Sequence, residues 1–265
     1  MEGLYHDAFY RFVNVDKPEA LREALYDVCK AAGVLGSILV AHEGINGMLA
    51  GTDKALANVR AFFEADERFK AMSYKRTACK TKPFWRLIIR LKNEIVPLGI
   101  SGVDGRETGT DVSPEQWREL LEEDNLILID NRNDFEYRLG HFRGAINPEV
   151  DNFREFAAYV ENHAGEWKDK KVAMYCTGGI RCEKTSAWMK NLGFEVYQLE
   201  GGILNYFAEI SDAERDYEGE CFVFDKRVAL DTKLQETDTT LEDIGQHHWV
   251  YDPKDSSADD SGDAS

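Results

Sequence analysis

A short apolar segment that ends in a cysteine is the strongest chemical signal in this sequence. Val172 to Cys176 is followed by Thr177-Gly178-Gly179-Ile180-Arg181 and then by residues that favour a helix. The glycines allow successive backbone N–H groups to point inward and bind an anion, and a helix that begins here adds the positive end of its dipole. Both effects favour the thiolate, the nucleophilic form of cysteine. We therefore predict that Cys176 and Arg181 are catalytic, with Thr177, Gly178, Gly179 and Ile180 as the loop that holds an anion.

The spacing between Cys176 and Arg181 narrows the chemistry. Four residues separate them, one fewer than in the Cys-x5-Arg loop of tyrosine phosphatases and related arsenate reductases. The shorter ring leaves less room for a tetrahedral oxyanion and suits a terminal sulfur, so the loop resembles that of rhodaneses, whose cysteine carries a persulfide. Cys182 follows in the first turn of the expected helix, where it is either a resolving thiol or a packed helix residue.

Two further segments resemble elements of rhodaneses. Phe135 to Pro148 is similar to Glu-x-x-x-Gly-His-Ile-x-Gly-Ala, with Phe142 in the place of the isoleucine, and Leu199 to Tyr206 is similar to the closing Gly-Gly-x-x-x-Trp element. His141 and Asp130 allow a catalytic pair, but in rhodaneses such residues mostly fix loops through hydrogen bonds.

Positive charge is concentrated in one segment of an acidic chain. The 265 residues carry a formal net charge of -17, yet nine bases and no acid lie between Arg68 and Lys92, with aromatic residues among them. Basic side chains neutralise phosphates and aromatic rings stack on unpaired bases, so the segment predicts an RNA-binding surface. The alternative is a solvated pair of charged strands. The residues expected to contact RNA are Lys75, Arg76, Lys80, Lys82, Arg86 and Arg90.

Two α/β domains are expected, joined by a glycine-rich linker. Residues 1–96 have the order βαββαβ of ferredoxin-like or acylphosphatase-like α+β domains, with strands at 8–15, 35–41, 48–50 and 84–91, helices at 18–32 and 53–67, and a turn at 43–47. Cys29 falls on the apolar face of the first helix and should be core. Residues 97–112 form the linker, and residues 113–212 alternate between helix and strand as in a doubly wound parallel sheet. A C-terminal extension (213–230) and an acidic tail of disordered composition (231–265) follow.

Composition favours a reducing cytoplasm. The five cysteines are odd in number and form no Cys-x-x-Cys pair, which argues against a disulfide framework and a zinc module. No run approaches the roughly 20 apolar residues of a membrane span, and the N-terminus lacks the pattern of a signal peptide. The sequence contains no facial triad or dinucleotide fingerprint, so neither a metal nor a flavin site is expected. The adjacent His247 and His248 are only a weak metal signal.

Three long motifs, in this order, resemble those of the tRNA uridine(34) hydroxylase family: Gly36 to Gly47, Cys176 to Lys184 and Gly219 to Val228. The resemblance covers roughly residues 5–230 and implies a small N-terminal domain joined to a single rhodanese domain. It also implies a cytoplasmic enzyme that hydroxylates C5 of the wobble uridine (position 34) of tRNA to 5-hydroxyuridine, using molecular oxygen and an unidentified electron donor. The partner is then the anticodon loop of tRNA, and Cys176 is the active-site cysteine. Many relatives continue into a cysteine-rich segment that this chain lacks.

Cys176 is the most reactive group that the sequence offers for such a reaction. It either attacks C6 of uridine or carries a reactive sulfur species, while Arg181 and the loop amides hold the negative charge. Two alternatives stay open. A plain sulfurtransferase with a cysteine persulfide would leave the basic segment idle, and a non-catalytic rhodanese-like scaffold would not need Cys176.

Overall fold

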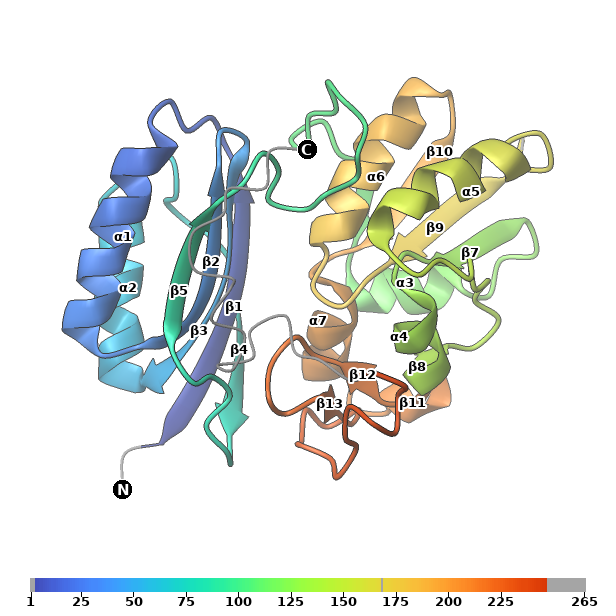
Figure 1. Cartoon of the computed structure of the whole chain (residues 1–265). Helices are drawn as coiled ribbons and strands as arrows, with labels where there is room; N and C mark the ends of the chain where they lie inside the picture. Colours follow the sequence, from blue (N-terminus) through green and yellow to red (C-terminus); the bar gives the residue numbers. More distant parts are fainter. Residues whose placement is uncertain (1–2, 168, 247–265) are drawn as a thin grey trace.

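The computed structural model describes residues 3–167 and 169–246, which form two domains side by side (Figure 1). The N-terminal sheet has five strands in the order β4-β1-β3-β2-β5. Helices α1 (Pro18–Ala32) and α2 (Asp53–Glu64) cover its outer face, and its other face is turned toward the second domain. The strands are β1 (Leu4–Phe12), β2 (Leu35–Ala41), β3 (Gly44–Thr52), β4 (Tyr74–Cys79) and β5 (Leu87–Leu91).

The sequence explains where α1 begins and ends. Pro18 lies in the first turn, where a missing N–H costs nothing. Gly33 ends the helix at a φ of 72°, a left-handed conformation that glycine adopts without strain. Leu21, Leu25 and Cys29 recur at helical spacing and are buried, so Cys29 lies in the core as predicted.

Two details of this domain differ from the expected βαββαβ order. The base-rich segment contains an additional strand, β4, which pairs with β1. Only Thr77 of β4 is buried, so this strand lacks the apolar alternation that reveals strands in a sequence. The segment 43–47 is also not a turn, because the chain reverses at His42–Glu43 and β3 begins at Gly44. Gly44 has a φ of 145°, and any side chain there would collide with the carbonyl oxygen of Arg11. The other elements differ from expectation only at their ends.

The second sheet is parallel, as expected, with its strands in the order β6-β10-β9-β7. These strands are β6 (Thr110–Val112), β7 (Leu126–Asp130), β9 (Lys171–Tyr175) and β10 (Glu195–Leu199). They alternate with the helices α3 (Pro114–Leu120), α4 (Asp134–Leu139), α5 (Phe156–His163), α6 (Ile180–Asn191) and α7 (Gly202–Glu209). Because β6 lies within residues 97–112, the stretch expected to be a linker already ends inside the sheet.

Short elements complete the second domain, and the chain after α7 also reaches the first domain. β8 (Gly140–Phe142) pairs with β11 (Tyr217–Gly219), and β12 (Cys221–Phe222) pairs with β13 (Ala229–Leu230). Two 3-10 helices complete the elements, at Phe153–Glu155 and Ala213–Arg215. The Glu236 carboxylate accepts the N–H groups of Lys80 and Thr81, so ordered structure extends into the expected tail. His247, His248 and the rest of that tail lie outside the described residues.

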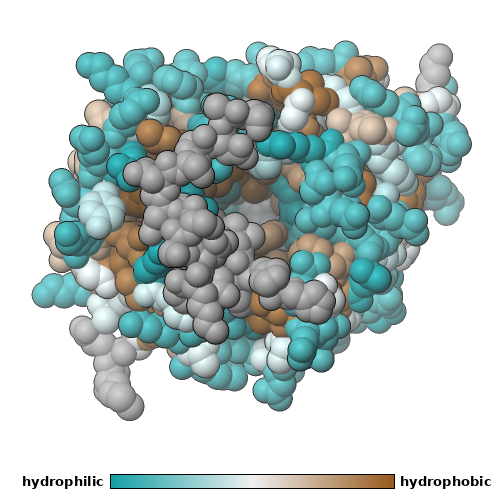
Figure 2. Space-filling model, in the orientation of Figure 1, coloured by the Kyte–Doolittle hydropathy of each residue, from teal (hydrophilic) through white to brown (hydrophobic). Residues whose placement is uncertain are grey.

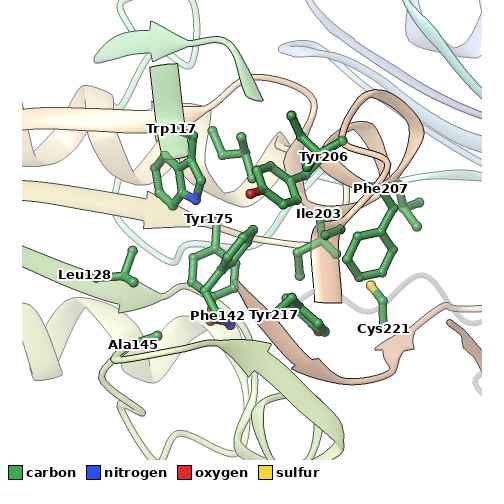
Figure 3. Packing of buried hydrophobic residues seen from close by; sticks show 14 of the residues in the cluster. Trp117, Leu128, Phe142, Ala145, Tyr175, Ile203, Tyr206, Phe207, Tyr217 and Cys221 are labelled. Atoms are coloured by element: carbon green, nitrogen blue, oxygen red, sulfur yellow. Dashed lines mark hydrogen bonds between the residues drawn. The ribbon is translucent and has the colours of Figure 1, made fainter. Parts of the chain in front are cut away.

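An aromatic cluster forms the core of the second domain (Figure 3). The ring of Phe142 is fully buried and lies edge-on to Tyr175, Tyr206 and Tyr217, with ring centroids 4.7, 4.9 and 5.3 Å apart. Such edge-to-face pairs add to the free energy of burial. Phe142 and Tyr206 are the two residues that depart from the rhodanese-like pattern, and here they pack against each other.

Buried polar contacts join the two domains. The Lys184 ammonium of α6 binds both carboxylate oxygens of Glu43, at 3.0 and 2.9 Å, and also contacts the carboxylate of Glu94. Near the C-terminal end, Arg227 donates to the Thr77 hydroxyl at 2.7 Å and is paired with Asp225. The exterior seen in Figure 2 is mostly hydrophilic, with apolar residues in small patches. Among the helices of the described residues, none has the length and apolar character that a membrane span requires.

Candidate active site

Cys176 lies directly after β9, and the chain turns through Thr177–Gly179 into α6. Gly179 has a φ of 99°, which glycine adopts readily. The start of α7 supports the loop from outside, because the N–H of Ile203 donates to the carbonyl oxygen of Cys176 at 3.0 Å. A side chain at Gly202 would collide with that same oxygen. The two glycine-rich motifs of the sequence therefore lie in contact.

The surroundings of the Cys176 sulfur favour its thiolate form. Its residue is 1% exposed, and the N–H of Gly179 lies 3.1 Å from Sγ. Burial by itself raises the pKa of a thiol, but hydrogen bonds from the side chain and backbone of Cys182 and the charge of Arg181 lower the pKa of Cys176 to about 5. The loop therefore provides the anion-stabilising environment that the sequence predicts.

Cys182 stays protonated and is hydrogen-bonded to Cys176. It is fully buried, and its burial and its hydrogen bond to Cys176 raise its pKa well above the ordinary range. In this arrangement the Cys182 S–H donates a hydrogen bond to the Cys176 sulfur. The resolving role of Cys182 stays a prediction.

Arg181 differs from the free anion-binding fork that the sequence suggests. Its Nη1 and Nη2 atoms donate to the two carboxylate oxygens of Glu136 at 2.7 and 2.8 Å, and both side chains are buried. Burial opposes the charge of Glu136, but Arg181 outweighs it and the pKa of Glu136 is lowered. Arg181 therefore acts on the loop as one half of a buried ion pair. Glu136 was missed as a site residue, although it opens the rhodanese-like segment.

Asp130 and His141 belong to separate networks and do not form a catalytic pair. Asp130 is fully buried in a bidentate ion pair with Arg132, at 2.8 and 2.6 Å. The His141 ring lies 3.1 Å from Glu218 and is stacked on Tyr137. Both residues fix loops, the alternative favoured from the sequence.

The N-terminal domain contributes side chains to the cysteine loop. The Tyr10 hydroxyl of β1 donates to Glu183 Oε1 at 2.6 Å, and a side chain at Gly179 would meet this hydroxyl. The Lys75 ammonium of β4 lies 4.6 Å from the centroid of the Tyr10 ring, and its Cδ lies beside Gly178. No sequence signal pointed to Tyr10 or Glu183, and Lys75 was expected to contact RNA.

The other bases expected to contact RNA have different surroundings. Arg76 forms ion pairs with Asp7, at 2.8 Å, and with Asp53, so carboxylates of its own domain largely neutralise its charge. Lys80 and Lys82 are exposed, and Arg86 and Arg90 are half-buried. The acid-free segment of the sequence is therefore not one uniform basic surface.

A concavity with two exposed rings lies between the base-rich segment and the C-terminal extension. Trp85 is 42% and Phe224 is 37% exposed, and Pro83, Phe84, Arg86 and Lys226 line the same hollow. Lys226 lies 4.7 Å from the Trp85 ring, and the Phe224 ring lies 5.8 Å from the guanidinium of Arg181. The concavity thus adjoins the cysteine loop. Within the described residues, no group of three His, Cys, Asp or Glu side chains is placed to hold a metal ion.

Comparison with known proteins covers both domains of the chain. The family models for the UPF0176 acylphosphatase like domain and the rhodanese-like domain match residues 6–95 and 113–209. A protein of Legionella pneumophila (strain Corby) named tRNA uridine(34) hydroxylase is 46% identical over 236 residues, which are 88% of this chain and 93% of that protein. The chain belongs to the tRNA uridine(34) hydroxylase family. A protein of the same name from Sinorhizobium medicae (strain WSM419) is 45% identical, over 88% of this chain and 75% of its own length.

Family membership confirms the resemblance found in the three motifs. It also confirms the predicted fold class, an acylphosphatase-like domain followed by a rhodanese-like domain with a parallel sheet. In this member of the tRNA uridine(34) hydroxylase family, the rhodanese-like loop is closed on one side by the other domain.

Proposed function

We propose that this chain is a tRNA uridine(34) hydroxylase in which Cys176 is the reactive group. The observation that carries the proposal is the buried Cys176 thiolate in a chain whose relatives bear that name across both domains. The product is 5-hydroxyuridine. One atom of O2 enters the C5–H bond as a hydroxyl, and the other leaves as water after uptake of two protons and two electrons from a donor in the cytoplasm.

Cys176 activates the pyrimidine by addition to C6. The S–C6 bond forms while the C5–C6 π electrons move toward C5 and O4, which makes C5 electron-rich and able to form a bond to O2. The two electrons and two protons from the donor then cleave the O–O bond, which leaves a hydroxyl on C5 and releases water. Loss of the C5 proton and cleavage of the S–C6 bond restore the C5–C6 double bond and the thiolate. A thiolate with a pKa near 5 is available for this addition at neutral pH without a separate base.

The tRNA contacts the concavity that holds Trp85 and Phe224. Exposed aromatic rings beside positive side chains suit unpaired nucleobases. The nucleobases stack on the rings, and the positive side chains neutralise the phosphates. Lys226 supplies positive charge beside the Trp85 ring, and the exposed Lys80 and Lys82 add positive charge in the segment that leads to it. Because Cys176 is 1% exposed, the wobble base must leave the stack of the anticodon loop to reach the sulfur.

The test is nucleoside mass spectrometry of tRNA from a strain without this activity, complemented with the full chain or with variants. Cys176→Ser should abolish 5-hydroxyuridine, whereas Cys79→Ser, a half-buried thiol outside the loop, should leave it unchanged. Full retention of 5-hydroxyuridine in Cys176→Ser would refute the role of Cys176. Sulfurtransferase turnover from thiosulfate to cyanide, with no 5-hydroxyuridine from the wild type, would establish the persulfide alternative instead.

A further inference from the structure

The cysteine loop faces an unusual lysine that belongs to the other domain. The Lys75 side chain reaches from β4 across the domain interface, so that its Cδ lies beside Gly178 and its ammonium lies over the Tyr10 ring. Within residues 3–167 and 169–246, the Lys75 ammonium makes neither a hydrogen bond nor an ion pair with a carboxylate. A half-buried lysine without a carboxylate partner is costly in a fold and calls for another anion.

The pairing of β1 and β4 explains why Lys75 and Tyr10 act together. Ala8 lies directly opposite Lys75 in the antiparallel register, and Tyr10 is two residues further along β1, so both side chains lie on the same face of the sheet. That face is the one turned toward the second domain (Figure 1). The Tyr10 hydroxyl is anchored by Glu183, in the first turn of the helix that follows the loop.

The two cations near the cysteine loop, Arg181 and Lys75, differ in whether a carboxylate pairs with them. Arg181 donates to both oxygens of Glu136, so a buried anion offsets part of its charge, although Arg181 still lowers the pKa of Cys176. Lys75 has no such partner. Burial lowers the pKa of Lys75, and the negative charge of Glu183, followed by that of Cys176, opposes that fall, so the ammonium interacts with both anions.

We propose that Lys75 is a second cation of the active site, beside Arg181, that stabilises negative charge on the Cys176 sulfur, and that Tyr10 and Glu183 hold it in position. If the proposed function holds, the same ammonium also stabilises the charge that moves toward O4 when Cys176 adds to C6. The rhodanese-like domain thus supplies the nucleophile and the N-terminal domain supplies the counter-charge. The reacting centre is complete only when the two domains are docked.

The test measures the thiolate directly, on the purified full chain. The rate of alkylation of Cys176 by iodoacetamide is followed by mass spectrometry from pH 4 to pH 9, with Cys176→Ser as the blank. Lys75→Met should raise the alkylation midpoint by about one unit or more, because a neighbouring charge shifts a pKa by roughly one to three units. Lys75→Arg should restore most of the wild-type profile. Lys54→Met removes a charge from the exposed surface of α2 and should change nothing.

An unchanged midpoint in Lys75→Met would overturn the proposal. Lys75→Gln provides a second neutral variant should the methionine variant unfold, as judged by circular dichroism. Production of 5-hydroxyuridine is measured separately, and it should fall at least tenfold in both neutral variants. If the wild type makes no 5-hydroxyuridine, the proposed function fails, but the alkylation profile still decides the role of Lys75.

Discussion

The buried ion pair between Arg181 and Glu136 gives a quantitative prediction. Both side chains are at most 8% exposed and share two hydrogen bonds of 2.7 and 2.8 Å. Arg181→Met removes one partner and leaves a carboxylate in the core, which costs about 3–5 kcal/mol in comparable sites. Glu136 would keep its hydrogen bond from the backbone N–H of Asn133 at 3.1 Å. We therefore expect the lower end of that range, about 3 kcal/mol.

The double variant Arg181→Met with Glu136→Gln separates the charge from the packing. Without the carboxylate, no uncompensated charge is buried, so the double variant should lose only about 1–2 kcal/mol, less than either single variant. Unfolding in urea, followed by tryptophan fluorescence, measures all three against the wild type. The reasoning is refuted if Arg181→Met costs less than about 1 kcal/mol, or if the effects of the two single variants simply add.

Three further predictions concern the domain interface and its titratable groups. Lys184→Met leaves the Glu43 and Glu94 carboxylates facing each other without a cation, so it should lower the thermal midpoint and expose the linker to limited proteolysis. Burial, and then the charge of Arg227, lower the pKa of His6 to about 4. The unfolded chain therefore binds the extra proton between pH 6.5 and pH 4, and stability should fall by roughly 3 kcal/mol across that window. His6→Asn should flatten this part of a urea-unfolding series against pH. Burial raises the pKa of Glu183 to about 7, so its contribution is complete below pH 4.5 and is lost as the pH rises through 7. Glu183→Gln should accordingly gain stability relative to the wild type between those values, and an unchanged difference between pH 5 and pH 8 would contradict this.

The cysteine loop was predictable because the residues that form it are consecutive in the sequence. A strand, three small or polar residues and a helix follow one another in the chain, and together they place the amide groups around one sulfur. The pairing of Arg181 with Glu136 was not predictable in the same way, because the two residues are 45 positions apart in the sequence. The sequence supplied both residues, but only the packing of α4 against the loop determines that each neutralises the other.

The role of Lys75 could not be read from the chain either. Lys75, Arg76 and Lys80 look equivalent within a segment rich in basic residues, yet Lys75 lies beside the cysteine loop, Arg76 is held in ion pairs and Lys80 is exposed. The difference arises from β4, a strand with too little apolar alternation to be recognised. Strand register then assigns each base to a face. The positive charge of this segment therefore indicated an anionic partner, but it did not show which basic residues would contact that partner.

Residues of all three family motifs contribute to the interface between the two domains. Glu43 of the first motif binds Lys184 of the cysteine motif. In the third motif, Arg227 bonds to Thr77, two residues along β4 from Lys75. Each contact therefore holds the N-terminal sheet against the thiolate loop, at a point where a single displaced strand would withdraw the lysine. The cysteine loop on its own is sufficient for a reactive sulfur, and the other two motifs act by fixing which charges and which substrate surface that sulfur faces.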